Sequence, residues 1–269
     1  MSLALSLAPP APEIRERHLL GMPEMGFRGV SEQWLMRRAG DLHWRLIARA
    51  MGQREAVFTC AEGQPLYAAF CATSLRITAP RLPELGGFLT ISASLGRLGH
   101  GRLASVQRLL LEGKTIGRIV LISTFVGRSD PSSNRSILRR TPRALALPPE
   151  APALARRIAN QAVRLAKVGG KEFPGPSISL MPCPYTDFNA AKLMYFPSFI
   201  ALAERADFSL GGECERMIGA RDVIHLGNVE PGKAVRATLA RRLRARTDCL
   251  LNTSDGRQLA LLRSRYHCS

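Results

Sequence analysis

A long helix followed by four strand-like segments occurs twice along this chain of 269 residues, and this repetition limits the folds that it can adopt. The first round has a helix over residues 31–51 and strands over 64–78, 87–96, 101–112 and 115–127. The second has a helix over 187–205 and strands over 216–228, 233–244, 246–253 and 257–266. A helix packed on a meander of strands forms a two-layer α+β unit. The sequence therefore predicts two copies of one α+β module.

The first helix carries recognisable signals at both ends. Ser31 suits the N-cap, and Glu32 places a negative charge at the positive end of the helix dipole. Leu35 and Leu42 belong to an apolar series at helical spacing, and Gly52 provides a natural end. The strand-like segments that follow are separated by proline- and glycine-containing turn signals, which favours an antiparallel meander.

The second round repeats this plan with one irregular point. A short lead-in strand is expected over residues 179–183, ahead of the helix. Pro197 falls inside the segment predicted as helix, where its ring removes a hydrogen-bond donor. We expect it either to kink the helix or to reset the point at which the helix begins.

The segment between the two rounds has a different character. Residues 128–178 are basic and rich in proline, which favours an extended connection, and the apolar spacing within 153–168 predicts one short amphipathic helix. We therefore divide the chain into a loose N-terminal leader (1–20), a first module (21–127), a linker with a short helix (128–178) and a second module (179–269).

The chain has a formal net charge of +17, and only five of its 38 basic residues are lysines. Such a charge attracts polyanions, and arginine suits phosphate particularly well. The candidates are nucleic acid, an acidic carrier protein and the phosphates of coenzyme A; compositional bias without a binding role is an equally good explanation. No recognised nucleic-acid motif accompanies the arginines, which argues against nucleic acid.

Several classes of protein are disfavoured. The six cysteines are scattered singly and the histidines do not fall at ligand spacing, so we expect neither a disulfide framework nor a metal site. No stretch approaches the roughly 20 apolar residues that cross a bilayer, and we expect a cytoplasmic protein with no membrane association. There is no nucleophile elbow, phosphate-binding loop or dinucleotide fingerprint. Any chemistry is therefore expected to need no cofactor.

Four segments carry a resemblance to a known family: GMPEMGFRGVSEQWLMRRAGDLHW at 21–44, PLYAAF at 65–70, PCPYTDFNAAKLMYFPSFIALAERAD at 182–207 and RDVIHLGNVEPG at 221–232. They resemble the LnmK-type bifunctional acyltransferase/decarboxylase family, over roughly residues 20–266. This resemblance implies a double hot-dog fold, in which each of two antiparallel sheets wraps a long central helix. The predicted fold class is thus α+β, double hot-dog.

The resemblance also implies a reaction on acyl thioesters of polyketide-type biosynthesis. The family's namesake takes a methylmalonyl group from coenzyme A onto a tyrosine, decarboxylates it and passes propionyl to the phosphopantetheine of an acyl carrier protein. The matching tyrosine here is Tyr67, which implies acyl-CoA and an acidic acyl carrier protein as partners. A phenol needs a neighbouring group to activate it, because its pKa is about 10. The simpler alternative is an aromatic side chain packed on a strand.

Three further polar residues are candidates for the site. Asp187 and Asn189 stand where the second helix is predicted to begin, which is where hot-dog enzymes commonly place polar active-site residues. Asp187 is more plausibly a helix cap, and Asn189 is the better candidate for holding a thioester oxygen or a water. Asn228 matches the end of the RDV…GN pattern and is a possible substrate contact, although asparagine is also common in turns.

The histidines are weaker candidates. His43 could serve acid–base chemistry or contact substrate, but packing beside Trp44 is the more frequent outcome. His100 lies among glycines that could form a phosphate-binding nest. For His225, a solvated or hydrogen-bonded imidazole is a simpler interpretation than a catalytic base.

Three alternatives to the acyltransferase/decarboxylase remain open. The first is a thioesterase or dehydratase on the same fold, with Asp187 or Asn189 central and no covalent intermediate. The second is a nucleic-acid-binding protein that uses its arginine excess. The third is a protein that binds a carrier protein without catalysis.

Overall fold

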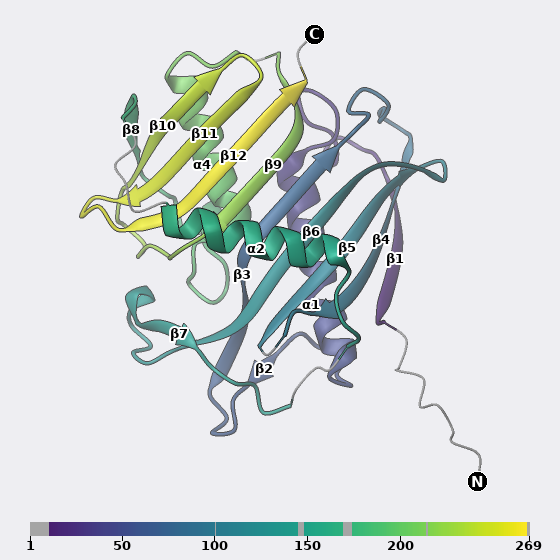
Figure 1. The fold of residues 1–269 in the computed structure, drawn as a ribbon, viewed down its shortest axis with the longest axis vertical. Helices are drawn as coiled ribbons and strands as arrows, with labels where there is room; N and C mark the ends of the chain where they lie inside the picture. The colour runs from purple at the N-terminus through teal and green to yellow at the C-terminus, as the bar shows by residue number, and fades with distance from the viewer. Residues whose placement is uncertain (1–10, 100, 145–147, 169–173, 214, 268–269) are drawn as a thin grey trace.

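The computed structural model describes residues 11–99, 101–144, 148–168, 174–213 and 215–267 (Figure 1). Its helical elements are α1 (Glu32–Ala50), η1 (Asn134–Ser136), α2 (Ala153–Val168), α3 (Pro184–Asp187) and α4 (Phe196–Ser209). The strands of the first half are β1 (Glu13–Leu19), β2 (Phe58–Thr59), β3 (Pro65–Ile77), β4 (Phe88–Arg97), β5 (Arg102–Leu111), β6 (Lys114–Arg128) and β7 (Ile137–Arg139). Those of the second are β8 (Ser177–Leu180), β9 (Met217–His225), β10 (Val235–Leu243), β11 (Arg246–Thr253) and β12 (Gln258–His267).

The strands of both halves form one continuous 12-stranded sheet in the described chain. The halves join through β3 and β9, which pair antiparallel from Ala72 to Arg76 on the first strand. Outward from this junction the order is β3-β6-β5-β4-β1 on one side and β9-β12-β11-β10-β8 on the other. The two orders correspond strand for strand, which confirms the predicted duplication.

The long helices α1 and α4 lie together on one face of the sheet and share a single apolar core. Leu35, Leu42 and Leu46 of α1 are completely buried, and Phe199 and Ile200 of α4 are nearly so. Each half of the sheet therefore wraps one central helix, as a double hot-dog requires.

Gly40 sets how closely the two helices approach. A Cβ atom at this position would lie 2.7 Å from Cε1 of Phe196, nearer than carbon atoms normally come. Gly40 weakens the intrinsic propensity of α1, but it leaves room for the aromatic ring of α4.

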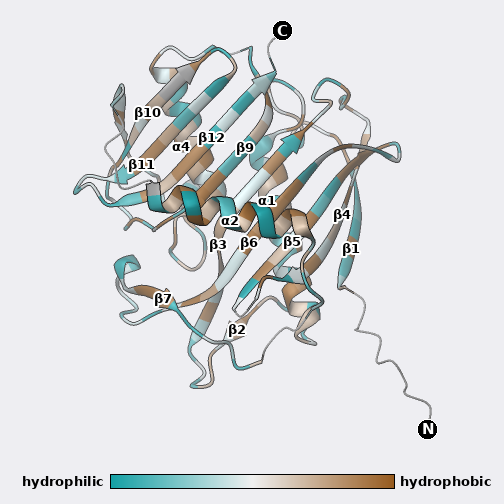
Figure 2. Cartoon of the chain, viewed as in Figure 1, coloured by the Kyte–Doolittle hydropathy of each residue, from teal (hydrophilic) through white to brown (hydrophobic). Residues whose placement is uncertain are grey.

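Helix α2 lies across the opposite, outer face of the sheet (Figure 1). Its Ala155 and Ala159 pack against Ala72, Val120 and Ile122 on the central strands. Hydrophobic and hydrophilic bands alternate along α2 in Figure 2, as expected for a helix with one buried side. The helix predicted over 153–168 is confirmed at those residues.

Two boundary predictions are wrong. The second long helix does not run from 187: it begins at Phe196, and Pro197 occupies its first turn, where a missing N–H costs nothing. Of the two outcomes expected for this proline, it resets the start of the helix. Residues 13–19 are not a loose leader but form β1, which pairs with β4 because Ile14 is buried in the core.

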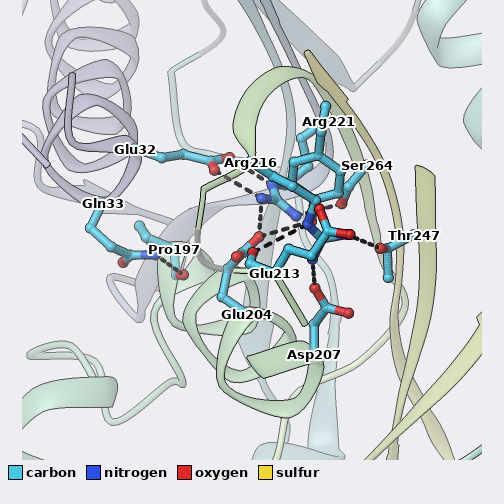
Figure 3. Close-up of polar contacts among 11 residues, drawn as sticks. Glu32, Gln33, Pro197, Glu204, Asp207, Glu213, Arg216, Arg221, Thr247 and Ser264 are labelled. Atoms are coloured by element: carbon cyan, nitrogen blue, oxygen red, sulfur yellow. Dashed lines mark hydrogen bonds and ion pairs between the residues drawn. The ribbon is translucent and has the colours of Figure 1, made fainter. Parts of the chain in front are cut away.

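A buried ionic cluster ties the start of α1 to the second half of the chain (Figure 3). The guanidinium of Arg221, 3% exposed, donates to both carboxylate oxygens of Glu32 at 2.8 and 3.1 Å. It also contacts Glu204 of α4 and Ser264 of β12. Burial raises the pKa of the Glu32 carboxyl. The cluster fixes α1 against the sheet of the other half.

Candidate active site

A cavity of about 370 Å³ lies where the two halves of the molecule meet. Strands β3 and β6 of the first half line one side, and the α3–α4 connection, α4 and the end of β9 line the other. Phe70, Phe196, Phe199 and Leu226 make most of this lining apolar. Cavities of this size and composition are typical of small-molecule sites.

His225, at the end of β9, lines this cavity with its imidazole ring. Its Nε2 is inaccessible to solvent and has no hydrogen-bond partner within the described ranges. The rings of Phe199 and Phe196 meet the imidazole edge-on, with centroids at 5.1 and 6.4 Å. Burial in these surroundings lowers the pKa of His225 to about 4, so the imidazole is neutral near pH 7. Sequence reasoning ranked this histidine low; its place among aromatic side chains arises from α4.

Asn189 lies in the loop that precedes α4, where it lines the cavity. It does not lie inside a helix, as predicted, because α4 begins later. Its Oδ1 accepts from the backbone N–H groups of Ala191 and Leu193 at 3.0 and 3.1 Å, which shapes the loop. No described residue pairs with its Nδ2, which leaves this group to donate to a ligand.

Asn228 also lines the cavity, but its polar atoms are used within the protein. Its Oδ1 accepts from the N–H groups of Met194 and Val229 at 2.9 and 3.0 Å, and its Nδ2 donates to the carbonyl of Met194 at 3.1 Å. The residue joins the segment after β9 to the loop before α4. Its position supports the wall of the cavity.

Asp187 does not line the cavity. Its carboxylate is 3% exposed and accepts from the N–H of Cys183 at 2.8 Å, which closes the short helix α3. The prediction that the Asp187 side chain caps the long helix is therefore wrong. Its carboxylate instead stabilises the short helix α3. Asp187 contacts the start of the long helix through its backbone, where its carbonyl accepts from the N–H of Tyr195 at 2.7 Å.

Tyr67 stands beside the cavity and not in its lining. On β3 it lies two residues before Ala69, a lining residue, so the two share one face of the strand. The guanidinium of Arg128 lies 5.9 Å from the centre of the Tyr67 ring. Arg128 is therefore the candidate for the group that activates the phenol of Tyr67.

Neither of the other two predicted histidines reaches the cavity. His43 is completely buried, with its two ring nitrogens 2.8 Å from the hydroxyls of Ser105 and Ser123. It is a hydrogen-bonded core residue, and the predicted substrate contact is wrong because α1 turns it into the sheet. Burial lowers its pKa to about 3. His100 lies outside the described residues.

Arginines give the cavity a positive character, and its described lining contains no carboxylate. Arg257 donates to the carbonyl of Asn228 at 2.8 Å, while its buried Nε has no partner in the described structure. Arg135 also lines the cavity, and it pairs with the exposed Asp255 at 2.6 Å. The cavity therefore combines an apolar wall with cationic groups.

Asn134 is a site residue that sequence reasoning missed. It is 5% exposed, and its Nδ2 donates to the carbonyls of Lys192 and Val229, both at 2.9 Å. Its Oδ1 accepts from Arg128 at 2.7 Å. These bonds fix the linker against the second half along one edge of the cavity. Its segment, SDPSSNRS, reads as an ordinary polar loop in the sequence.

The corresponding place in the other half is also open, but its lining differs. The loops before α1 and α4 each contain an antiparallel bridge, Met25 with Val30 and Phe188 with Met194. Beside the first of these loops a cavity of about 440 Å³ is lined by polar and charged side chains together with one methionine: Arg28, Arg81, Glu215, Met217 and His267. Both corresponding positions therefore hold a cavity, and the one before α4 has the more apolar lining and no carboxylate among its described residues.

In the described parts of the chain, no group of three or more His, Cys, Asp or Glu side chains could hold a metal ion. No helix there is both long and apolar enough to cross a membrane. Four of the cysteines are described, and all four are free thiols.

No protein-family model matches the sequence, and no curated protein matches it. Solved structures do match the fold. The acyl-ACP thioesterase from Bacteroides thetaiotaomicron superposes with a TM-score of 0.66 at 9% identity, covering 95% of this chain and 98% of that one. The 12:0-ACP thioesterase from Umbellularia californica gives 0.63 at 12% identity, with coverages of 95% and 97%.

A third structure of this kind is a MaoC-like dehydratase from Phytophthora capsici, with a TM-score of 0.52 at 13% identity and coverages of 96% and 95%. Identities this low establish a shared fold only. The match nevertheless extends over almost the whole chain, including both halves and the helix between them. This chain has the double hot-dog fold.

Proposed function

We propose that this protein is an enzyme that processes acyl thioesters in the cavity between its two halves. The observation that carries the proposal is the neutral imidazole of His225 in the lining of a largely apolar cavity that Asn189 also lines. Solved structures of the same fold include thioesterases that act on acyl-ACP, which supports this class of substrate. Thioester hydrolysis is the reaction that these residues fit best.

In this proposal the acyl group packs against Phe196 and Phe199, and the two polar residues meet the thioester carbonyl. Neutral His225 accepts a hydrogen bond from a water molecule and takes its proton as the oxygen attacks the carbonyl carbon. Asn189 donates through Nδ2 to the developing oxyanion. The carbon–sulfur bond then breaks, His225 returns its proton to the sulfur, and the carrier leaves as a thiol while the acyl group is released as a carboxylic acid.

The phosphopantetheine arm that carries the acyl group is expected to extend out of the cavity alongside its cationic groups. Coenzyme A and phosphopantetheine both carry phosphate, for which arginine is well suited. Arg257 has an unpaired buried Nε, and no carboxylate in the described lining competes for it. Both acyl-CoA and acyl carrier proteins are therefore proposed as donors.

The test is release of free thiol from a panel of acyl-CoA thioesters of increasing chain length. His225→Gln should lower kcat/KM by about 10²–10⁴-fold, the range for loss of a general base. His18→Gln, which changes a histidine on β1, should leave it unchanged. Equal activity in wild type and His225→Gln would sink the assignment. Hydration of enoyl thioesters without thiol release would redirect it to a dehydratase.

The second candidate is the acyltransferase/decarboxylase chemistry that resemblance to the LnmK-type family implies, with Tyr67 as the nucleophile. One observation favours this second candidate: Tyr67 lies on the same strand face as the cavity residue Ala69 and beside Arg128. Incubation with methylmalonyl-CoA should then add acyl mass to the wild type and release carbon dioxide. Tyr67→Phe should abolish both, and a mutant that behaves like the wild type would eliminate this reaction.

A further inference from the structure

Arginines line up across the outer face of the sheet in a single transverse row. The strand registers place Arg108 opposite Arg118, and Arg118 opposite Arg76. Beyond Ala220, which interrupts the row, Arg265 stands opposite Arg246. On the other side Ser92 separates Arg108 from Arg15 of β1. The row thus contains an arginine on each of six strands.

All of these side chains point away from the core. The neighbours of Arg118 and Arg76 along their strands, Ile119 and Leu75, are buried beneath the sheet. Alternation along a strand therefore sends the arginines to the outer face. Four of them, Arg15, Arg108, Arg118 and Arg265, are exposed.

Few carboxylates compensate this row. Arg76 pairs with Asp222 at 2.8 Å and Arg246 with Asp248 at 2.7 Å. The four exposed arginines make no ion pair with any described residue. Like charges directly opposite each other on neighbouring strands destabilise a sheet. The row therefore costs the folded protein stability unless an anionic partner covers it.

Spacing distinguishes between possible partners. Neighbouring strands lie about 4.7–4.9 Å apart, which sets the distance between adjacent positions of the row. An α-helix that lies across the strands presents one residue per turn of about 5.4 Å, close to this interval. Helix α2 already lies across the same face, parallel to the row and about 13 Å from it along β3, from Ala72 to Arg76.

The surroundings of the row match an acidic helix better than a single-stranded nucleic acid. Helix α2 has no acidic residue, and its Arg157, Arg164 and Lys167 are exposed. No aromatic side chain occurs among the arginines of the row, whereas single strands bind through aromatic stacking as well as charge. We propose that the arginine row and α2 form a docking surface for an acidic helix of a partner protein. The proposal does not depend on the reaction in the cavity.

The experiment measures fluorescence anisotropy of a labelled helical peptide of about 20 residues with one glutamate per turn along one side, at low salt. The row variant, Arg108→Gln/Arg118→Gln/Arg265→Gln, should bind about tenfold more weakly than the wild type, since exposed ion pairs contribute modestly. The control removes the same charge elsewhere, as Arg54→Gln/Arg81→Gln/Arg143→Gln, at three exposed positions outside the row. It should bind like the wild type.

Two outcomes would overturn the proposal. Equal loss of binding in the row variant and the control means that net charge alone is responsible. Tighter binding of a 20-base-pair DNA duplex than of the peptide, lost in the row variant, assigns the surface to nucleic acid. A separate readout is stability: relief of repulsion should make the row variant melt above the control variant at low salt.

Discussion

At the scale of single residues, two histidines have opposite surroundings. His43 is buried and uses both ring nitrogens in hydrogen bonds to serine hydroxyls, whereas His225 lines a cavity and its Nε2 has no partner in the described chain. The sequence places each histidine correctly on a helix or strand. It cannot reveal which neighbours surround the ring, because those come from distant strands and helices. A catalytic assignment for histidine therefore depends on the tertiary structure.

The buried state of His43 predicts a pH dependence of stability. Its pKa is lowered from about 6.5 to about 3, so the unfolded chain binds the proton more readily between these values. Stability is therefore fully present above pH 6.5 and is lost as the pH falls. Between pH 7 and pH 5 the loss should be about 2 kcal/mol. Urea denaturation should show this slope reduced in His43→Gln, and an unchanged slope would contradict the assignment.

At the scale of elements, local patterns located most helices and strands but misplaced the start of α4. Residues 187–195 contain helix-compatible side chains, yet hydrogen bonds from Asn189 and Asn228 hold this segment in a loop. Pro197 then provides the start signal. A propensity argument could recognise the proline, but it could not foresee the bond from Asn228, which lies 34 residues away. The cavity exists because this segment is a loop.

The contact between α1 and α4 predicts an unusual effect of a helix-favouring mutation. Gly40→Ala improves helix propensity by about 1 kcal/mol. The new methyl group would nevertheless meet the ring of Phe196, and overpacking costs about 1–3 kcal/mol. We expect no gain or a net loss of stability in chemical denaturation. The second change Phe196→Leu should recover it; a clear stabilisation by Gly40→Ala alone would show that the helices can separate freely.

At the scale of the whole molecule, the two halves form one body. The sheet continues from β3 to β9, and the cluster around Arg221 joins α1 to α4, β9 and β12. The duplication of modules was predictable from the sequence, since each module has its own periodic signals. Their pairing was not, because contacts across 146 residues, such as the ion pair of Arg76 with Asp222, leave no local pattern.

The ionic cluster predicts how the halves depend on each other. Arg221→Met leaves the buried Glu32 without its partner and should destabilise the protein by about 3–5 kcal/mol. The double variant Glu32→Gln/Arg221→Met removes the uncompensated charge and should regain much of this loss. Guanidinium denaturation measures both. A single variant as stable as the wild type would show that the cluster does not hold α1 in place.

The most direct test of the account is a crystal structure with a non-hydrolysable acyl-CoA analogue. We expect the acyl group in the cavity between the halves, with the carbonyl of the analogue within hydrogen-bond distance of Asn189 Nδ2 and beside the His225 ring. The phosphates should lie near Arg257 or Arg135. Binding beside the loop before α1, or no binding in the cavity at saturating analogue, would contradict the central claim.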